Sequence, residues 1–147
     1  MTLEELIARL RPVLHARDDV RFAALFGSAA TRGPESARDI DIAVSFTRKP
    51  TWLELARLGE ELEAIAGKDV DLVDVDDAST LLRWEVVKAA RPIAVRERRA
   101  WVELLARVPI EHADLRPYFE RESRGLRRAL EETRWSRSTS SATRSDD

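Results

Sequence analysis

Two aspartates separated by one residue, Asp39 and Asp41, are the side chains of this sequence best placed to do chemistry. They begin a stretch of alternating residues, 40–46, that predicts a β-strand. Alternate side chains of a strand leave the same face about 7 Å apart, so both carboxylates point one way and the intervening isoleucine points the other. Mg²⁺ binds such carboxylates and completes its shell with water and substrate phosphate. The pair is therefore compatible with metal-assisted phosphoryl chemistry.

A glycine and a serine, Gly27-Ser28, stand directly after a second predicted strand, Val20–Phe26. Glycine lets the backbone approach a phosphate closely, and a short helix beginning at the serine would direct free N–H groups toward it. An Asp-x-Asp pair alone is not diagnostic, because the chain has two more, at 69/71 and 74/76. The Gly-Ser dipeptide, ten residues before Asp39, favours a phosphate site over a solvated acidic edge, although a plain turn would also fit.

The segment 25–46 reads Leu-Phe-Gly-Ser, then ten residues, then Asp-Ile-Asp-Ile-Ala-Val, and resembles the signature of the nucleotidyltransferase superfamily. At this length the chain is similar to the minimal nucleotidyltransferases, the antitoxin partners of HEPN-domain ribonuclease toxins in prokaryotes. The resemblance covers about residues 3–98, and its motif is more specific for the superfamily than for the antitoxin branch. It implies an α/β fold with a mixed, nucleotidyltransferase-like sheet, packed helices and a C-terminal helical extension.

The resemblance also implies a set of catalytic, metal-binding acids. Asp39 and Asp41 would bind two Mg²⁺ ions, and Asp71 would complete one metal site and take the proton of the attacking hydroxyl. Asp71 stands in an apolar-Asp-apolar-apolar pattern on the next predicted strand, 70–75. Asp69 would share its face and is the alternative for this role.

The co-substrate implied by the resemblance is ATP. Its β- and γ-phosphates would be held by the Gly27 backbone and by Ser28. The family also has an arginine in this loop, and Arg32 is the candidate, displaced by one position from the commonest pattern.

Helical periodicity and capping residues predict the elements that position these groups. A capping box, Thr2-x-x-Glu5, opens a helix that Pro12 is expected to kink or end. Another helix is expected over about 51–66, with Gly67 as its C-cap. The remaining expected elements are a polar loop over 29–38, a strand over 70–75, a helix from Ser79 to about Ala90 and a short edge strand over 92–95.

The sequence divides into a predicted nucleotidyltransferase core over 1–98, a helical extension over 99–135 and a tail over 136–147. Breaks in the extension are expected near Pro109 and Pro117. The tail consists of Ser, Thr, Arg and Asp with one alanine, so it has nothing to bury and is expected to be disordered.

Composition excludes several classes of protein. The 147 residues suffice for one ordinary domain, and the absence of cysteine excludes disulfides and thiolate chemistry. No apolar run is long enough to span a membrane, and the acidic N-terminus lacks the features of a signal peptide. A net charge of −2, from 25 bases and 27 acids, gives no general attraction to nucleic acid. We therefore expect a cytoplasmic protein that binds neither membranes nor nucleic acid directly.

Three functions are compatible with the sequence. The first is an antitoxin enzyme that transfers AMP from ATP to a tyrosine of a HEPN toxin and neutralises it, as the resemblance implies. The second is a binding antitoxin with a vestigial nucleotide site. The third is a nucleotidyltransferase for a small molecule such as an aminoglycoside, which would need more substrate-binding structure than the short extension offers. The complete acidic set favours the first.

Overall fold

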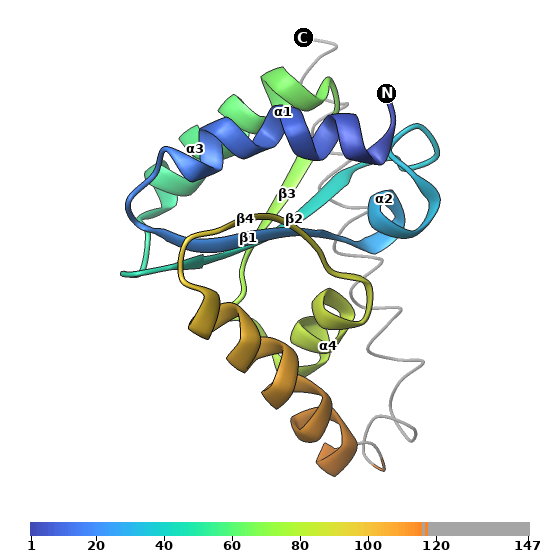
Figure 1. Cartoon of the computed structure of the whole chain (residues 1–147), viewed down its shortest axis with the longest axis vertical. Helices are drawn as coiled ribbons and strands as arrows, with labels where there is room; N and C mark the ends of the chain where they lie inside the picture. The colour runs from blue at the N-terminus through green and yellow to red at the C-terminus, as the bar shows by residue number, and fades with distance from the viewer. Residues whose placement is uncertain (116, 118–147) are drawn as a thin grey trace, which may run out of the picture. The chain divides into compact units, whose positions relative to one another are not determined.

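A computed structural model describes residues 1–115 and 117, and within it four strands form one sheet in the order β3-β2-β1-β4 (Figure 1). β1 pairs antiparallel with β2 and β4, while β2 and β3 are parallel, so the sheet is mixed, as predicted. β4 lies at an edge, where its proline does not interrupt a ladder on both sides. The strands are β1 Val20–Phe26, β2 Ile40–Phe46, β3 Val70–Asp74 and β4 Arg91–Val95.

Helices begin and end at residues that satisfy their terminal backbone groups. The Thr2 hydroxyl accepts a hydrogen bond from the Glu5 amide, and Thr51 accepts one from Glu54, so both helices open with complete capping boxes. Gly67 ends the second of them in the left-handed region, at φ 71°. The helices are α1 Leu3–His15, α2 Gly27–Arg32, α3 Trp52–Ala66 and α4 Thr80–Ala89, and residues 98–112 are also helical.

Two prolines do not end helices as the sequence predicts. α1 continues through Pro12, and the helical residues 98–112 continue through Pro109. A proline inside a helix costs about 3 kcal/mol because it removes a hydrogen bond and crowds the preceding turn. Leu14 after the first proline is 1% exposed and Val108 beside the second is fully buried, so apolar burial offsets this cost.

The segment predicted as a loop over 29–38 is helical in its first part. α2 occupies Gly27–Arg32, and only the residues after it are irregular. Ala29 is fully buried, and the Thr31 hydroxyl donates to the Gly27 carbonyl oxygen at 3.2 Å. Burial and this local hydrogen bond hold one and a half turns of helix that the polar composition does not indicate.

Two apolar cores cover the two faces of the sheet. α1 and α3 pack on one face, which we call the α1 face (Figure 1). α4 and residues 98–112 pack on the other, the α4 face, where Phe22 meets Trp101 edge-on with ring centroids 5.2 Å apart. Both faces are therefore closed within the unit Met1–His112, which extends past the predicted core boundary at residue 98.

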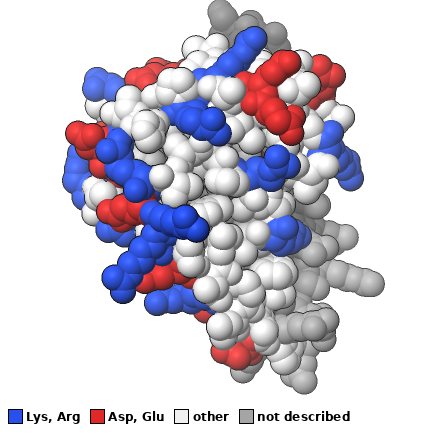
Figure 2. All heavy atoms as spheres, in the orientation of Figure 1, with Lys and Arg blue, Asp and Glu red and all other residues white. Residues whose placement is uncertain are grey.

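The described surface carries both signs of charge. Acidic and basic side chains are interspersed on the face drawn in Figure 2. Within residues 1–115 and 117, no helix has the length and apolar character needed to cross a bilayer. The tail predicted over 136–147 and the break predicted near Pro117 lie on or beside residues outside the described part of the chain.

Candidate active site

Asp41 lies near the beginning of β2 and is directed toward the α4 face. Its neighbours Ile40 and Ile42 belong to the core on the α1 face, whereas Ala43 belongs to the core on the α4 face. Alternation along the strand therefore places the Asp41 carboxylate on the α4 face, as the sequence predicts. The residue is only 4% exposed. Burial keeps this carboxylate largely out of water, so its charge acts on neighbouring groups more strongly than it would in solvent.

Asp71 is the neighbour of Asp41 in the sheet. The parallel register of β2 and β3 pairs these two residues directly. Leu72 packs against the core of the α1 face and Val73 against the core of the α4 face, so Asp71 shares the face of Asp41. Adjacent strands lie about 4.8 Å apart. The two carboxylates thus start from neighbouring backbone positions on one face.

Gly27 brings backbone against the Asp41 carboxylate. A Cβ atom built on this glycine would lie 2.3 Å from Asp41 Oδ2, which no real side chain tolerates. Its φ of +67° is also in the left-handed region that favours glycine. Both the close approach and the backbone conformation therefore require glycine at this position.

α2 begins at the same glycine, immediately after β1. Its N-cap residue, Phe26, makes no side-chain capping hydrogen bond. Ser28 is exposed in the first turn. Arg32 is exposed at the opposite end of the helix, about 7 Å along its axis from Gly27. The structure thus brings Gly27 to Asp41, leaves Ser28 exposed next to it in the chain, and places Arg32 at the far end of α2.

The four aspartates at the beginnings of β2 and β3 differ in exposure: Asp41 is buried, Asp39 and Asp71 are partly buried, and Asp69 is exposed. Asp39 is partly exposed and precedes the first residue of β2, while Asp69 is exposed and precedes β3. The Ile40 amide donates to the Asp69 carbonyl oxygen at 2.9 Å, which joins the two strand beginnings. Asp71 is partly buried and in register with Asp41, so its position favours it over Asp69 as the third acid.

The donor set fits Mg²⁺ in its chemistry. Carboxylate oxygens are the ligands this ion prefers, and it usually takes one or two of them together with water and substrate phosphates. Among residues 1–115 and 117, no three acidic or histidine side chains are gathered as a ready-made metal cage. In this part of the chain the three predicted acids, Asp39, Asp41 and Asp71, are therefore not gathered as one cluster, whereas the strand register does pair Asp41 with Asp71.

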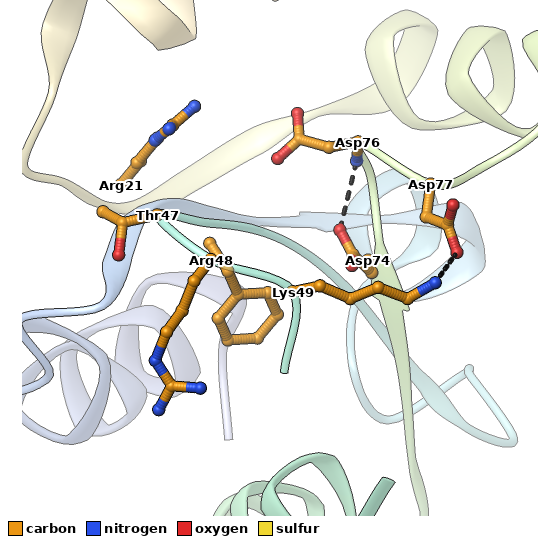
Figure 3. A pocket seen from close by; sticks show the side chains of 8 residues that line it. Arg21, Thr47, Arg48, Lys49, Asp74, Asp76 and Asp77 are labelled. Atoms are coloured by element: carbon orange, nitrogen blue, oxygen red, sulfur yellow. Dashed lines mark hydrogen bonds and ion pairs between the residues drawn. The ribbon is translucent and has the colours of Figure 1, made fainter. Parts of the chain in front are cut away.

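A separate pocket of about 420 Å³ lies at the other end of β2 and β3 (Figure 3). Its charged side chains pair locally: Lys49 contacts Asp77 at 3.4 Å, and the Asp76 amide donates to Asp74 at 3.3 Å. Burial raises the pKa of the Asp74 carboxyl above its usual value, and the hydrogen bond from Asp76 opposes the shift. The Ser45 hydroxyl donates to Asp76 at 2.7 Å. This pocket is about 15 Å along the strands from Asp41 and contains none of the predicted site residues.

The comparison with protein families decides the family of the chain. Residues 8–99 match the family described as "Polymerase beta, Nucleotidyltransferase", which is more than half of the chain. The chain belongs to this family. Its match covers α2 and the strands β1, β2 and β3, and therefore every residue of the nucleotidyltransferase motif described above.

Relatives of this nucleotidyltransferase carry more specific names. A Methanocaldococcus jannaschii protein, provisionally named protein adenylyltransferase, is 33% identical over 90 residues, which are 61% of this chain and 96% of its own. Protein adenylyltransferase MntA of Thermococcus cleftensis is 38% identical over 76 residues, 50% of this chain and 77% of its own.

A solved structure of a more distant protein shows the same fold. The MNT antitoxin chain in the complex with tri-AMPylated Shewanella oneidensis HEPN toxin superimposes with a TM-score of 0.65 at 21% identity. The match covers 84% of this chain and 98% of the antitoxin. The fold class predicted from the sequence is thereby confirmed.

Proposed function

We propose that this nucleotidyltransferase is an antitoxin that transfers AMP from ATP to a tyrosine of a cognate HEPN ribonuclease toxin and so neutralises it. The observation that carries the proposal is the contact of Gly27 backbone with the buried carboxylate of Asp41, which is in register with Asp71. The names of the two relatives and the AMPylated toxin in the antitoxin complex support this acceptor. We further propose that the reaction takes place in the cytoplasm, where ATP is available.

The acids would bind the metal and the glycine loop would bind the nucleotide. Asp39 and Asp41 would hold two Mg²⁺ ions, and Asp71 would complete one of the sites. Bound Mg²⁺ would neutralise charge on the phosphates and on both the attacking and the leaving oxygens. Gly27 N–H and the Ser28 hydroxyl would donate to the β- and γ-phosphates. Arg32, at the far end of α2, would reach a phosphate only by extending back along the helix.

The reaction exchanges one phosphorus–oxygen bond for another. The tyrosine oxygen attacks the α-phosphorus of ATP, the bond to the β-phosphate oxygen breaks, and pyrophosphate leaves. Asp71 would take the proton of the tyrosine hydroxyl as the new bond forms. Burial of the neighbouring Asp41 reduces screening by water, so charges in the site act on one another more strongly than they would in solvent.

The test is a mass measurement on the toxin. The protein is incubated with ATP, Mg²⁺ and the HEPN-domain protein encoded beside it, and the toxin is expected to gain one or more AMP units. Asp41→Asn removes a metal-binding charge and should abolish the gain. Asp76→Asn is the matched control, since Asp76 lies in the pocket at the other end of β2 and β3.

The outcomes separate the three functions. A toxin that gains AMP and loses ribonuclease activity supports the proposal. A toxin that is inhibited without a change in mass would indicate a non-catalytic antitoxin instead. An intact toxin together with AMP transfer to an aminoglycoside would indicate a small-molecule enzyme. AMP transfer that survives Asp41→Asn would refute the assignment of the site.

A further inference from the structure

Lys68 joins two segments that lie far apart in the sequence. It follows Gly67 in the turn between α3 and β3. Its ammonium nitrogen donates to the carbonyl oxygens of Pro34 at 2.5 Å and of Ala37 at 2.7 Å, and it also contacts the Glu35 carbonyl oxygen at 3.4 Å. An ammonium has three N–H donors, so these carbonyl groups use the full capacity of the side chain.

The segments joined in this way are the ones that lead into the acids. Ala37 is 4% exposed and stands two residues before Asp39, in the loop between α2 and β2. On the other side, Lys68 directly precedes Asp69, whose carbonyl oxygen accepts the hydrogen bond from the Ile40 amide. The Lys68 side chain therefore joins the two segments immediately before the first paired residues of β2 and β3, Ile40 and Val70.

The beginning of β3 is held from α3 as well. The Val70 amide donates to Glu63 Oε1 at 3.1 Å, and the Gly67 amide donates to the Glu63 carbonyl oxygen at 2.9 Å. These contacts fix the turn that carries Lys68 but do not touch the loop before β2. Lys68 connects this turn to the loop before β2 through its hydrogen bonds to the Pro34 and Ala37 carbonyl oxygens.

We propose that Lys68 is a positioning residue of the active site: by tying the loop before β2 to the turn before β3, it fixes Asp39 and Asp41 relative to Asp71. Its catalytic consequence rests on the proposed function, since it presumes that these acids act together. The ammonium donates to backbone carbonyl oxygens, so the lysine acts on the acids through the backbone. Residues that orient metal ligands from outside are typically worth about 10- to 100-fold in affinity or activity.

The first measurement is hydrogen exchange of the free protein. Lys68→Met keeps the length of the side chain but removes all three donors, so amides of residues 35–41 are expected to exchange about tenfold faster. Lys68→Arg restores donors and should bring exchange back toward the wild-type rate. Arg11→Met is the matched control, because Arg11 Nε donates to the Ile93 carbonyl oxygen at 2.8 Å and ties α1 to β4, away from the acids.

The second measurement separates positioning from nucleotide binding. Lys68→Met is expected to lower kcat for AMP transfer about 10- to 100-fold and to raise the Mg²⁺ concentration for half-maximal rate. KM for ATP should change little, because the proposed phosphate contacts at Gly27 and Ser28 do not involve the lysine. Lys68→Arg should recover most of the rate. Lys68→Gln, which keeps two donors, replaces Lys68→Met if that variant does not fold.

Failure of the positioning role of Lys68 can be distinguished from failure of the proposed function. Wild-type exchange in Lys68→Met, or wild-type kcat and Mg²⁺ dependence from an active enzyme, would overturn the positioning role alone. Equal losses of kcat in Arg11→Met and Lys68→Met at matched melting temperatures would also overturn it. A wild-type protein that transfers no AMP refutes the proposed function and the catalytic role of Lys68 with it, while the exchange data still decide whether the loop is tied.

Discussion

Replacing Gly27 with alanine tests the contact on which the proposed site depends. Alanine in the left-handed region costs about 1–2 kcal/mol. The new Cβ atom would also meet Asp41 Oδ2 at 2.3 Å, so the carboxylate must move by about 1 Å to reach an ordinary contact. Moving a buried side chain off its preferred rotamer costs about 0.5–1.5 kcal/mol. We expect a total loss of about 2–3 kcal/mol, or about 6–10 °C in Tm.

The same displacement should reduce activity beyond its effect on stability. A misplacement of about 1 Å in a catalytic group can cost about 100-fold in rate, so AMP transfer by Gly27→Ala should fall by about that factor well below its Tm. Gly67→Ala is the matched control, since its φ is +71° and no atom lies within 4 Å of the added Cβ. It should lose about 1 kcal/mol to backbone strain and keep its activity.

A double-mutant cycle separates the steric clash between the new Cβ atom and Asp41 from the backbone strain of alanine at a positive φ. In Asp41→Ala the nearest remaining atom of residue 41, its Cβ, would lie 3.5 Å from the alanine at position 27, an ordinary contact. The cost of Gly27→Ala should therefore fall in this background to about 1 kcal/mol, the cost of Gly67→Ala. Equal costs of Gly27→Ala in both backgrounds, measured by thermal or urea unfolding, would refute the contact between backbone and carboxylate.

Three further changes test other parts of the structure. Thr51→Ala removes the capping box of α3 and should cost about 1 kcal/mol by urea unfolding, without altering AMP transfer. Asp74→Asn should raise the melting temperature slightly at pH 7, because burial raises the pKa of this carboxyl and its charge is unfavourable; the gain should shrink as the pH is lowered and the carboxyl becomes protonated. Leu104→Ala, at 5% exposure, should cost about 2–4 kcal/mol, whereas Leu105→Ala, at 36% exposure, should cost much less.

Local patterns in the sequence predict most of the elements around the site. The Thr2-x-x-Glu5 capping box predicts the beginning of α1, and helical periodicity with Gly67 as C-cap predicts α3. Alternation in 40–46 correctly predicts which side chains of β2 face each core. These signals depend on residues close together in the sequence, so they can be recognised without knowledge of the fold.

Tertiary structure decides the features that the sequence does not indicate. Pro12 and Pro109 are breakers by local rules, and burial of neighbouring apolar residues overrides them. The pairing of Asp41 with Asp71 depends on the register between two strands separated by α3. The contacts of Lys68 span 31 to 34 residues, and no spacing rule points to them. Long-range geometry of this kind becomes visible only once the sheet is assembled.

The helix that starts at residue 98 packs on the sheet face that carries Asp41, although the family match reaches only its first residues. The match ends at residue 99, yet Leu104 and Val108 are buried against Phe22 and Ala43 on the α4 face. Asp41 lies on that same face, between Phe26 in the neighbouring strand and Asp71. A helix that the family match barely reaches therefore helps to close the face on which Asp41 lies. Packing of this helix against Phe22 and Ala43 therefore contributes to the apolar core on the face that carries Asp41, which the motif alone does not determine.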